Sequence, residues 1–336
     1  MNLEDIAKLS GVSRSTVSRV VNHDPNVRTA TRERVLQIIN DVGYRPNIAA
    51  RGLAAGRNQI IGLVIPEAVS TIFADPYFPQ LIQGVTAVCN AMDHMLVLWL
   101  ADQLYERQMV HQMLSGGLIS GVVLAAAMVR EPTMEELLSS RLPFVMIGRH
   151  PRLGDISYVD VDNVGGAEKA VRHLWQLGRE RIGTISGPKN SVAGWDRLMG
   201  YRNALAETGV DAEQAKALEV EGDFTQIGGY RAMEMLLQQS VDAVFVASDI
   251  MAAGAIQAIN DAGRQVPKDI ALVGFDDAPV AARLKPALTT VHQPTEYTGM
   301  VAAEMLINAI QNPDVAPQHR ILPTELVVRA SCGGLA

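Results

Sequence analysis

Two successive sets of short apolar segments, separated by helical segments, constrain the fold of this chain more than any other feature. The first set begins at Ile60 and reads IIGLVIP, MLVLWLA, GVVLAAA and FVMIG. The second set ends at Pro294 and reads RIGTISG, DAVFVAS, IALVGFD and LTTVHQP. Short apolar strands that alternate with helices form parallel sheets with helices on both faces. Two such sets predict two similar α/β lobes, with a ligand cleft near the carboxyl ends of the strands.

The remaining general features indicate a soluble, cytoplasmic protein. The 336 residues suggest two or three domains, and an apolar content of 48% is enough for packed cores. The only two cysteines, Cys89 and Cys332, lack metal-like spacing and fit a reducing compartment. The N-terminus, MNLEDIAKLS, lacks the pattern of a secretory signal, and no apolar run approaches the length of a membrane span.

The first 46 residues predict a small helical domain. Leu3–Ser10 has apolar residues at helical spacing, Gly11 ends this helix, and Ser13 is placed to cap a second helix that runs to Val21. This helix, turn and helix form a helix-turn-helix pattern. A third helix is expected from Thr29 or Thr31 to Val42, with Gly43 as its C-cap. It is expected to bury Val35, Leu36, Ile38 and Ile39.

The second of these helices has two contrasting faces. Val17, Val20 and Val21 form an apolar stripe, and the opposite face holds only arginines and small hydroxyls, namely Arg14, Ser15, Ser18 and Arg19. Arginine can bind guanine through two hydrogen bonds in the major groove of DNA, and small hydroxyls bind phosphates. This face therefore favours DNA binding. The pattern leaves open an ordinary three-helix bundle with a solvated face.

The charge distribution agrees with a DNA-binding head. Residues 1–60 hold nine Lys and Arg against five Asp and Glu, a net charge of +4, so the rest of the chain carries −11 of the total of −7. A basic head on an acidic body keeps the attraction for phosphate local.

The stretches LEDIAKLSGVSRSTVSRVVN and VRTATRERVLQIINDVGYRPNIAARGLA resemble the head of lac repressor-type (LacI/GalR) transcription regulators. They match the motifs V-S-x-x-T-V-S-R-V-x-N and Y-x-P-N-x-x-A-R-x-L. The resemblance implies that Arg14, Ser15 and Arg19 read bases. It also places Thr16, Ser18 and Asn22 among the contacts to the DNA backbone.

Residues 47–58 then correspond to the hinge of that family. The segment from Asn47 to Ala55 is too short to persist as an isolated helix. The resemblance implies that it folds when two copies pair over a bent operator, with Leu53 wedged into the minor groove beside Ala54. Arg51 is expected to contact the DNA backbone. A flexible linker with Leu53 packed on the body is the alternative.

The resemblance covers the whole chain and implies a body, residues 59–336, like a two-lobe periplasmic sugar-binding protein. The chain is expected to cross between lobes near residues 160, 290 and 322. This gives an N-lobe of about residues 59–160 and 293–322. The C-lobe then comprises about residues 161–292 and 323–336.

Residues at strand ends are the candidates for binding an effector. Asp276, just past the strand IALVGF, is expected to accept two ligand hydroxyls, and Arg197 stands where the family has a ligand-binding arginine. The other candidates are Tyr77, Phe78, Arg149, Ser191, Phe224, Ser248 and Asp249. Three of these residues have structural alternatives: Asp249 as a helix cap, Arg197 as part of an interlobe salt bridge, and Phe224 as a core residue.

The residues at the cleft favour a sugar over a purine. Gly148 and Arg149 replace the acidic and aromatic residues of purine-binding relatives, and Ser191 and Ala193 replace other polar contacts. The chain lacks a G-x-S-x-G elbow, a Walker loop and a histidine cluster, so no enzyme activity, metal or cofactor is predicted. We expect a homodimeric repressor that binds double-stranded operator DNA under control of a small effector. The alternatives are a nucleobase- or nucleoside-dependent corepressor system and a sugar-binding transport protein.

Overall fold

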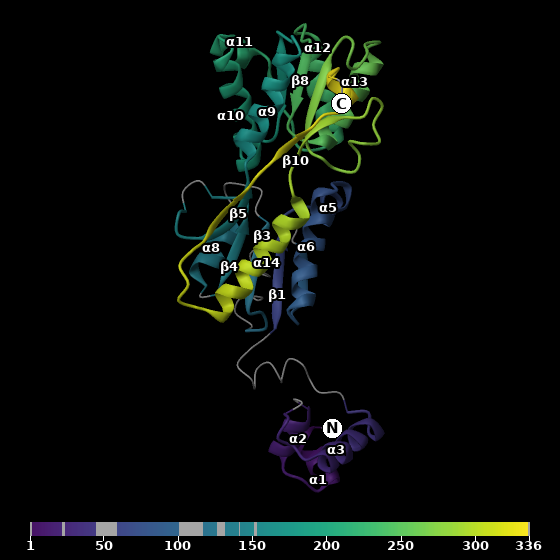
Figure 1. The fold of residues 1–336 in the computed structure, drawn as a ribbon, viewed down its shortest axis with the longest axis vertical. Coiled ribbons are helices and arrows are strands. Elements are labelled where there is room, and N and C mark those ends of the chain that lie inside the picture. The colour runs from purple at the N-terminus through teal and green to yellow at the C-terminus, as the bar shows by residue number, and fades with distance from the viewer. Residues whose placement is uncertain are drawn as a thin grey trace. The chain divides into compact units, whose positions relative to one another are not determined.

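The computed structural model describes residues 2–21, 24–44, 59–100, 117–125, 132–140, 142–150 and 153–334. It divides into two compact units, Met1–Asn58 and Gln59–Ala336, which Figure 1 shows with the labels used below. The predicted hinge, residues 47–58, lies outside the described residues.

The N-terminal unit contains three helices, α1 (Leu3–Ser10), α2 (Arg14–Val21) and α3 (Thr29–Asp41). As predicted, α1 ends at Gly11, whose φ of 64° is left-handed, and the Ser13 hydroxyl accepts a hydrogen bond from the Thr16 amide at 3.2 Å. Asn2 and Asp5 form a capping box at the start of α1. The helix-turn-helix pattern is therefore built from local capping signals.

The core of this unit is small, and of the four residues expected to be buried in α3 only Val35 is fully buried, while Ile38 and Ile39 are half-buried against it. Ile6, Val17, Val20 and Val35 are fully buried. Leu36 was expected inside but is 37% exposed, because Val35 already turns toward α1 and α2 and the next residue of a helix lies about 100° away. The C-cap of α3 is Val42, and the predicted Gly43 follows it with a φ of 62°.

The N-lobe of the body is a six-stranded parallel sheet in the order β11-β5-β4-β3-β1-β2. One face is covered by α6 and α14, and α8 packs on the other (Figure 1). Its elements are β1 (Ile60–Ile65), α5 (Val69–Ala74), α6 (Tyr77–Ala91), β2 (Met95–Leu100), β3 (Gly121–Ala125), α8 (Pro132–Ser139), β4 (Phe144–Ile147), β5 (Ser157–Val161), α14 (Thr295–Gln311) and β11 (His319–Leu322).

The C-lobe repeats this plan with the order β12-β10-β9-β8-β6-β7. The helices α12 and α13 pack on one face, and α9 and α10 pack on the other. Its elements are α9 (Asn163–Gln176), β6 (Ile182–Ser186), α10 (Val192–Glu207), α11 (Ala212–Ala217), β7 (Glu219–Glu221), α12 (Gln226–Leu237), β8 (Ala243–Val246), α13 (Asp249–Asp261), β9 (Ala271–Asp276), β10 (Thr289–His292), β12 (Glu325–Val327) and the 3-10 helix η1 (Ala330–Cys332). The sheet departs from the predicted parallel pattern at one edge, where β12 runs antiparallel to β10.

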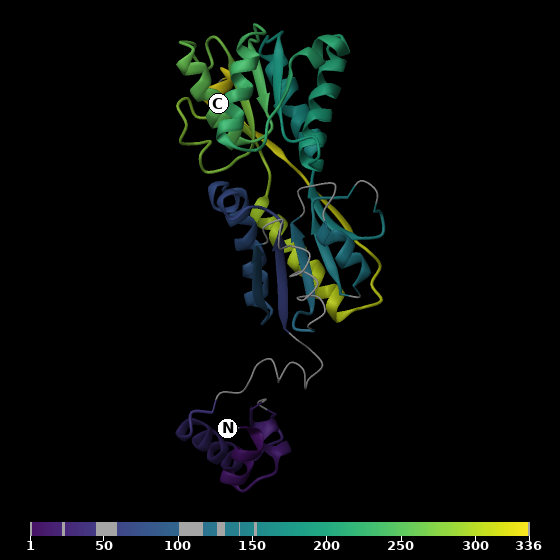
Figure 2. The ribbon, with the colours of Figure 1, turned by 180° about the vertical axis from the view of Figure 1, so that it is seen from behind.

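The chain passes between the two lobes three times. It leaves the N-lobe after β5, returns after β10 and crosses again between β11 and β12 (Figures 1 and 2). The returning helix α14 lies very close to α6. An added Cβ at Gly84 would collide with the Glu296 carbonyl oxygen, and one at Gly299 would collide with that of Leu81. These glycines make α14 and α6 a tightly packed pair beside the crossing point.

Candidate functional site

A cavity of about 240 Å³ lies between the lobes, at the carboxyl ends of the strands of both sheets. Its position agrees with the expected cleft of an open α/β fold. The lining residues of the N-lobe are Glu67, Thr71, Asp75, Tyr77, Phe78, Ala125, Ile147, Gly148, Asp160 and Thr298. Those of the C-lobe and the crossing segments are Val161, Asn163, Pro188, Ser191, Val192, Ala193, Arg197, Asp223, Phe224, Thr225, Ser248, Asp276 and Gln293.

Arg197 forms the polar centre of this cavity and is only 5% exposed. Its Nε donates to the side chain of Asn163 at 2.9 Å, and its Nη1 donates to the Ala247 carbonyl at 2.7 Å and to Asp276 at 3.2 Å. The guanidinium also stacks on the ring of Phe275, with its carbon 3.7 Å from the ring centroid. The arginine is therefore held rigidly, and its ion pair lies within the C-lobe rather than between lobes.

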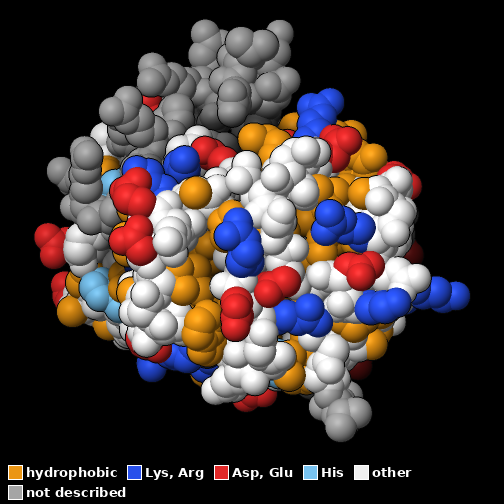
Figure 3. Space-filling view, turned by 90° about the horizontal axis from the view of Figure 1, so that it is seen from above, with side chains coloured by type: hydrophobic (Ala, Val, Ile, Leu, Met, Phe, Trp, Pro, Cys, Tyr) orange, Lys and Arg blue, Asp and Glu red, His pale blue; other side chains and the backbone are white. Residues whose placement is uncertain are grey.

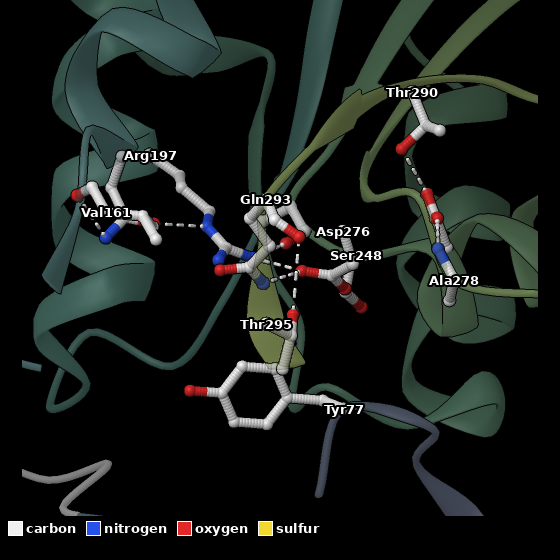
Figure 4. A network of polar contacts seen from close by, with 12 residues as sticks. Tyr77, Val161, Arg197, Ser248, Asp276, Ala278, Thr290, Gln293 and Thr295 are labelled. Carbon is white, nitrogen blue, oxygen red and sulfur yellow. Dashed lines mark hydrogen bonds and ion pairs between the residues drawn. The ribbon is translucent and has the colours of Figure 1, made fainter. Parts of the chain in front are cut away.

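Asp276 is the last residue of β9 and lies beside the Arg197 guanidinium (Figure 4). One carboxylate oxygen also accepts a hydrogen bond from the Gln293 amide at 2.6 Å, and Gln293 follows β10 at the second crossing. Burial raises the pKa of Asp276 to about 7, the Arg197 guanidinium opposes this rise, and the carboxylate of Asp75 adds to it. Asp276 of the C-lobe is thus hydrogen-bonded to a crossing segment through Gln293, and its pKa responds to the charge of Asp75 in the N-lobe.

Aromatic rings enter the cavity from both lobes. Tyr77 and Phe78 begin α6 and meet edge to face, with ring centroids 5.3 Å apart. Burial raises the pKa of Tyr77 above its usual range, so the hydroxyl stays protonated and can donate. Phe224, with a left-handed φ of 61°, lies against Gly187 in the C-lobe, where an added Cβ would collide with its ring. Phe224 therefore packs on its lobe and also lines the cavity.

Two of the predicted hydroxyl residues line the cavity while they cap helices. Ser191 accepts the Gly194 amide hydrogen at the start of α10, and Ser248 accepts that of Met251 at the start of α13. Each hydroxyl uses a lone pair in its cap and retains an O–H donor. Both can therefore position a helix and donate to a ligand.

The structure does not bring Asp249 into the cavity. Its side chain is fully buried, and its oxygens accept hydrogen bonds from the Thr290 hydroxyl at 2.6 Å and the Ala278 amide at 2.8 Å. Burial raises the pKa of Asp249 well above its usual range. The side chain of this first residue of α13 thus joins β10 to the loop after β9, so the predicted effector contact is replaced by a structural one.

Arg149 also has a different role from the predicted effector contact. It is not among the described residues that line the cavity, and its Nη2 donates to both carboxylate oxygens of Asp196 at 2.6 Å. Its Nε lies 3.7 Å from Asp160. Burial raises the pKa of Asp160 to about 6, the nearby Asp196 adds to the rise, and Arg149 opposes it. Arg149 belongs to the N-lobe and Asp196 to α10, so the interlobe ion pair is formed here rather than at Arg197.

Several lining residues were not predicted. Glu67, Asp160, Asn163 and Gln293 all lie just after a strand or at its last residues, as Asp276 does. The same signal of a polar residue at a strand end could have found Asp160, which is the fourth residue of SYVDV. That strand is half polar, so its sequence does not stand out as an apolar run.

The second candidate site is the open face of α2. Arg14, Ser15 and Arg19 are exposed, whereas Thr16 and Ser18 are half-buried. The Thr16 hydroxyl lies 2.9 Å from that of Ser13, and Arg19 lies 3.9 Å from Asp24. The face therefore presents two guanidinium groups to its surroundings. Five further DNA-contact candidates, Asn22, Asn47, Arg51, Leu53 and Ala54, lie outside the described residues.

Two other features, a metal site and a membrane-spanning helix, are absent from the described part of the chain. No group of three or more His, Cys, Asp or Glu side chains there is placed to hold a metal ion. No helix there is long and apolar enough to cross a membrane.

Comparison with known families matches both units of the chain. Residues 2–47 match the family model for bacterial regulatory proteins, lacI family, and residues 171–332 match that for a periplasmic binding protein-like domain. The HTH-type transcriptional regulator CelR of Thermobifida fusca is 39% identical over 333 residues, which cover 98% of this chain and 97% of that protein. The ribose operon repressor of Escherichia coli (strain K12) is 33% identical over 333 residues, covering 98% and 99%.

Solved structures are similar over the full chain. The transcriptional regulator CelR-cellobiose complex has a TM-score of 0.79 at 37% identity, covering 98% of this chain and 99% of that chain. The lac repressor dimer bound to operator and the anti-inducer ONPF has a TM-score of 0.86 at 27% identity, covering 99% of each chain.

Proposed function

This chain belongs to the lacI family of bacterial regulatory proteins, and we propose that it is a homodimeric repressor whose affinity for operator DNA is set by a sugar in the interlobe cavity. Its relatives are transcriptional regulators, so the chain is a helix-turn-helix regulator and not an enzyme, in agreement with the sequence prediction. The sugar, the repressor role and the dimer are the parts that we propose.

The pairing of Asp276 with Arg197 at the centre of the cavity carries the sugar proposal. A carboxylate accepts hydrogen bonds from sugar hydroxyls, a guanidinium donates to ring and hydroxyl oxygens, and an aromatic ring covers the apolar face of a sugar. The cavity offers all three, with Tyr77 and Phe78 from one lobe and Phe224 from the other. The similarity to a regulator solved with cellobiose supports the same class of ligand.

The exposed arginines of α2 support the proposed contacts with operator DNA. We assign base reading to Arg14, Ser15 and Arg19, since they form the open face of the second helix of a helix-turn-helix. Contacts to the DNA backbone and to the operator centre are assigned from the family resemblance to Thr16, Ser18, Asn22, Asn47, Arg51, Leu53 and Ala54.

The crossing segments suggest how a sugar could control DNA binding. A ligand that contacts both lobes binds one lobe angle better than another, and this difference shifts the equilibrium between the two states. Gln293 contacts Asp276 and leads into α14, which packs tightly on α6. A change at the cavity is thereby passed to the N-lobe. In the sequence, the N-lobe begins directly after the predicted hinge. A second subunit related as in the lac repressor dimer would give two heads for the two half-sites of an operator.

A thermal-shift screen of the full chain with cellobiose, ribose, other neutral sugars and nucleobases tests this function. A ligand at 100 times its dissociation constant stabilises the native state by roughly 2.7 kcal/mol, which gives a clear rise in Tm. We expect a sugar to raise Tm and to alter a gel shift on selected operator DNA. A response to a nucleobase and to no sugar would instead establish the corepressor alternative.

A further inference from the structure

The lining of the interlobe cavity is strongly unbalanced in charge. Its described residues include five carboxyl groups, from Glu67, Asp75 and Asp160 of the N-lobe and Asp223 and Asp276 of the C-lobe. Arg197 is the one cation among those described lining residues. A ligand in the cavity is therefore surrounded by carboxyl groups from both sides.

The charge of Arg197 is already engaged by the protein. The guanidinium donates to Asp276, Asn163 and a backbone carbonyl, and it lies flat on Phe275. An anionic ligand would have to compete with the Asp276 carboxylate for this cation. Such competition costs free energy, because Asp276 would lose the partner that offsets its burial.

Arg149, which is near the cavity but not among its described lining residues, also has its charge engaged by the protein. Arg149 lies 3.7 Å from Asp160, but its Nη2 donates to both oxygens of Asp196, which is not itself among the described lining residues. One guanidinium thus faces two carboxyl groups. It offsets their charge and does not supply a surplus of positive charge to a ligand.

The carboxyl groups of the N-lobe influence one another. Burial raises the pKa of Glu67, and the charge of Asp75 raises it further. Burial also raises the pKa of Asp75, although the Tyr77 amide donates to this carboxylate at 2.9 Å. Asp75 in turn adds to the raised pKa of Asp276 across the cleft. Each of these shifts is the response expected when carboxyl groups share a poorly solvated space with too few cations.

The surface at the C-lobe end of the body does not share this imbalance. The end of the body formed by the C-lobe shows Lys and Arg beside Asp and Glu, with hydrophobic side chains between them (Figure 3). This end of the surface therefore has a mixture of charges that the cavity lining does not have.

We infer that the cavity selects uncharged saccharides and rejects otherwise identical saccharides that carry a phosphate group. The inference rests on the proposed function, since it concerns the ligand of the same site. A neutral sugar satisfies the carboxyl groups with its hydroxyl donors, whereas a phosphate adds negative charge and brings no donors when it is ionised. A second like charge about 8 Å away, at an effective dielectric constant of about 20, weakens binding roughly 30-fold.

Calorimetric titration of the full chain with matched pairs of sugars tests this inference. The pairs are cellobiose and cellobiose 6′-phosphate, maltose and maltose 6′-phosphate, ribose and ribose 5-phosphate, and glucose and glucose 6-phosphate. For each neutral sugar that binds, we expect its phosphate to bind at least about 30-fold more weakly. The charge selection would be overturned if a sugar phosphate bound as tightly as its neutral partner, or if only the phosphate of a pair bound. Either result would still leave a sugar as the effector. If no member of any pair binds, the sugar proposal fails and this inference fails with it.

A pair of charge-removing substitutions separates charge from size. Glu67→Gln with Asp75→Asn removes two carboxylates but keeps their shape, and Asn at 75 can still accept the Tyr77 amide hydrogen. We expect the ratio of phosphate to neutral dissociation constants to fall at least about 5-fold in this variant, by the same Coulomb argument. The matched control is Glu213→Gln with Asp314→Asn, two exposed residues that are not among the described lining residues, and it should keep the wild-type ratio. An unchanged ratio in the cavity variant would show that phosphates are rejected by their size, which contradicts the inference. Because the ratio is taken within each protein, a general loss of stability does not affect it.

Discussion

Arg149 of the N-lobe donates to both carboxylate oxygens of Asp196 in the C-lobe, at 2.6 Å each. Asp196 precedes Arg197 on α10, so the residue that joins the two lobes is adjacent to the cation at the centre of the cavity. Asp160, which lines the cavity, lies 3.7 Å from the Nε of Arg149. This places an interlobe ion pair and the proposed effector site on neighbouring residues of one helix.

The first prediction concerns the strength of this interlobe pair. Asp196 is buried, so Arg149→Met leaves it without its partner, and we expect the free energy of unfolding to fall by about 1–3 kcal/mol. A double-mutant cycle with Asp196→Asn should give a coupling of about 1 kcal/mol or more in urea denaturation. The matched control is the exposed pair of Arg172 and Glu207, where Arg172→Met with Glu207→Gln should give a smaller coupling than the interlobe pair, because water screens the two charges. Equal couplings in both cycles would show that the interlobe pair is no stronger than a surface pair.

The second prediction concerns pH. Asp276 has a pKa of about 7 in the folded protein, above its value of 3.8 when unfolded, so the folded state binds the proton more tightly. Its favourable contribution to stability is complete below about pH 4 and is lost as the pH rises toward about 7. Asp276→Asn removes this loss, so the stability of the variant relative to wild type should increase by about 1 kcal/mol or more between pH 5 and pH 8. Urea denaturation across this range measures the difference. Parallel pH curves for Asp276→Asn and wild type would mean that Asp276 does not titrate there.

The third prediction separates base reading from phosphate binding. We expect Arg19→Ala to weaken binding to operator DNA by about 1–3 kcal/mol while binding to random DNA changes little, because a base contact acts only on its own sequence. Arg51→Ala should weaken both kinds of DNA about equally and reduce the dependence of binding on salt. Fluorescence anisotropy with both DNAs at two salt concentrations gives the comparison. Equal losses on operator and random DNA for Arg19→Ala would remove its base-reading role.

Much of the fold could be predicted because its strands are buried on both faces. Such strands appear in the sequence as uninterrupted apolar runs, and each of the eight predicted runs contains a strand. The four strands that were not predicted, β5, β7, β11 and β12, are short and carry polar residues. They lie at or near sheet edges, where one side of the strand meets solvent, so their pattern does not differ from that of a loop.

The site was predictable where a strand end directs a side chain into the cleft, as at Asp276, or where the family resemblance marks the position, as at Arg197. Asp276 and Arg197 fall in the cavity, but Asp249, which also follows a strand, turns into its own lobe toward Thr290. The partner of Arg149 is 47 residues away in the other lobe, and no local pattern links the two. Contacts across the cleft depend on how the lobes pack, and this information is not contained in the pattern of any one segment.

The central claim is that a sugar held by Asp276 and Arg197 controls the binding of operator DNA. The most direct test is a gel shift on operator DNA selected from random duplexes, with and without the sugar found in the thermal-shift screen. We expect the sugar to change the operator affinity of the wild-type chain about 10-fold or more, as a typical coupling between two sites would. Asp276→Ala and Arg197→Ala should bind the operator as the wild type does without sugar and should no longer respond to it, because each leaves buried polar groups of the ligand unpaired. Variants that still respond at the wild-type sugar concentration would contradict this account.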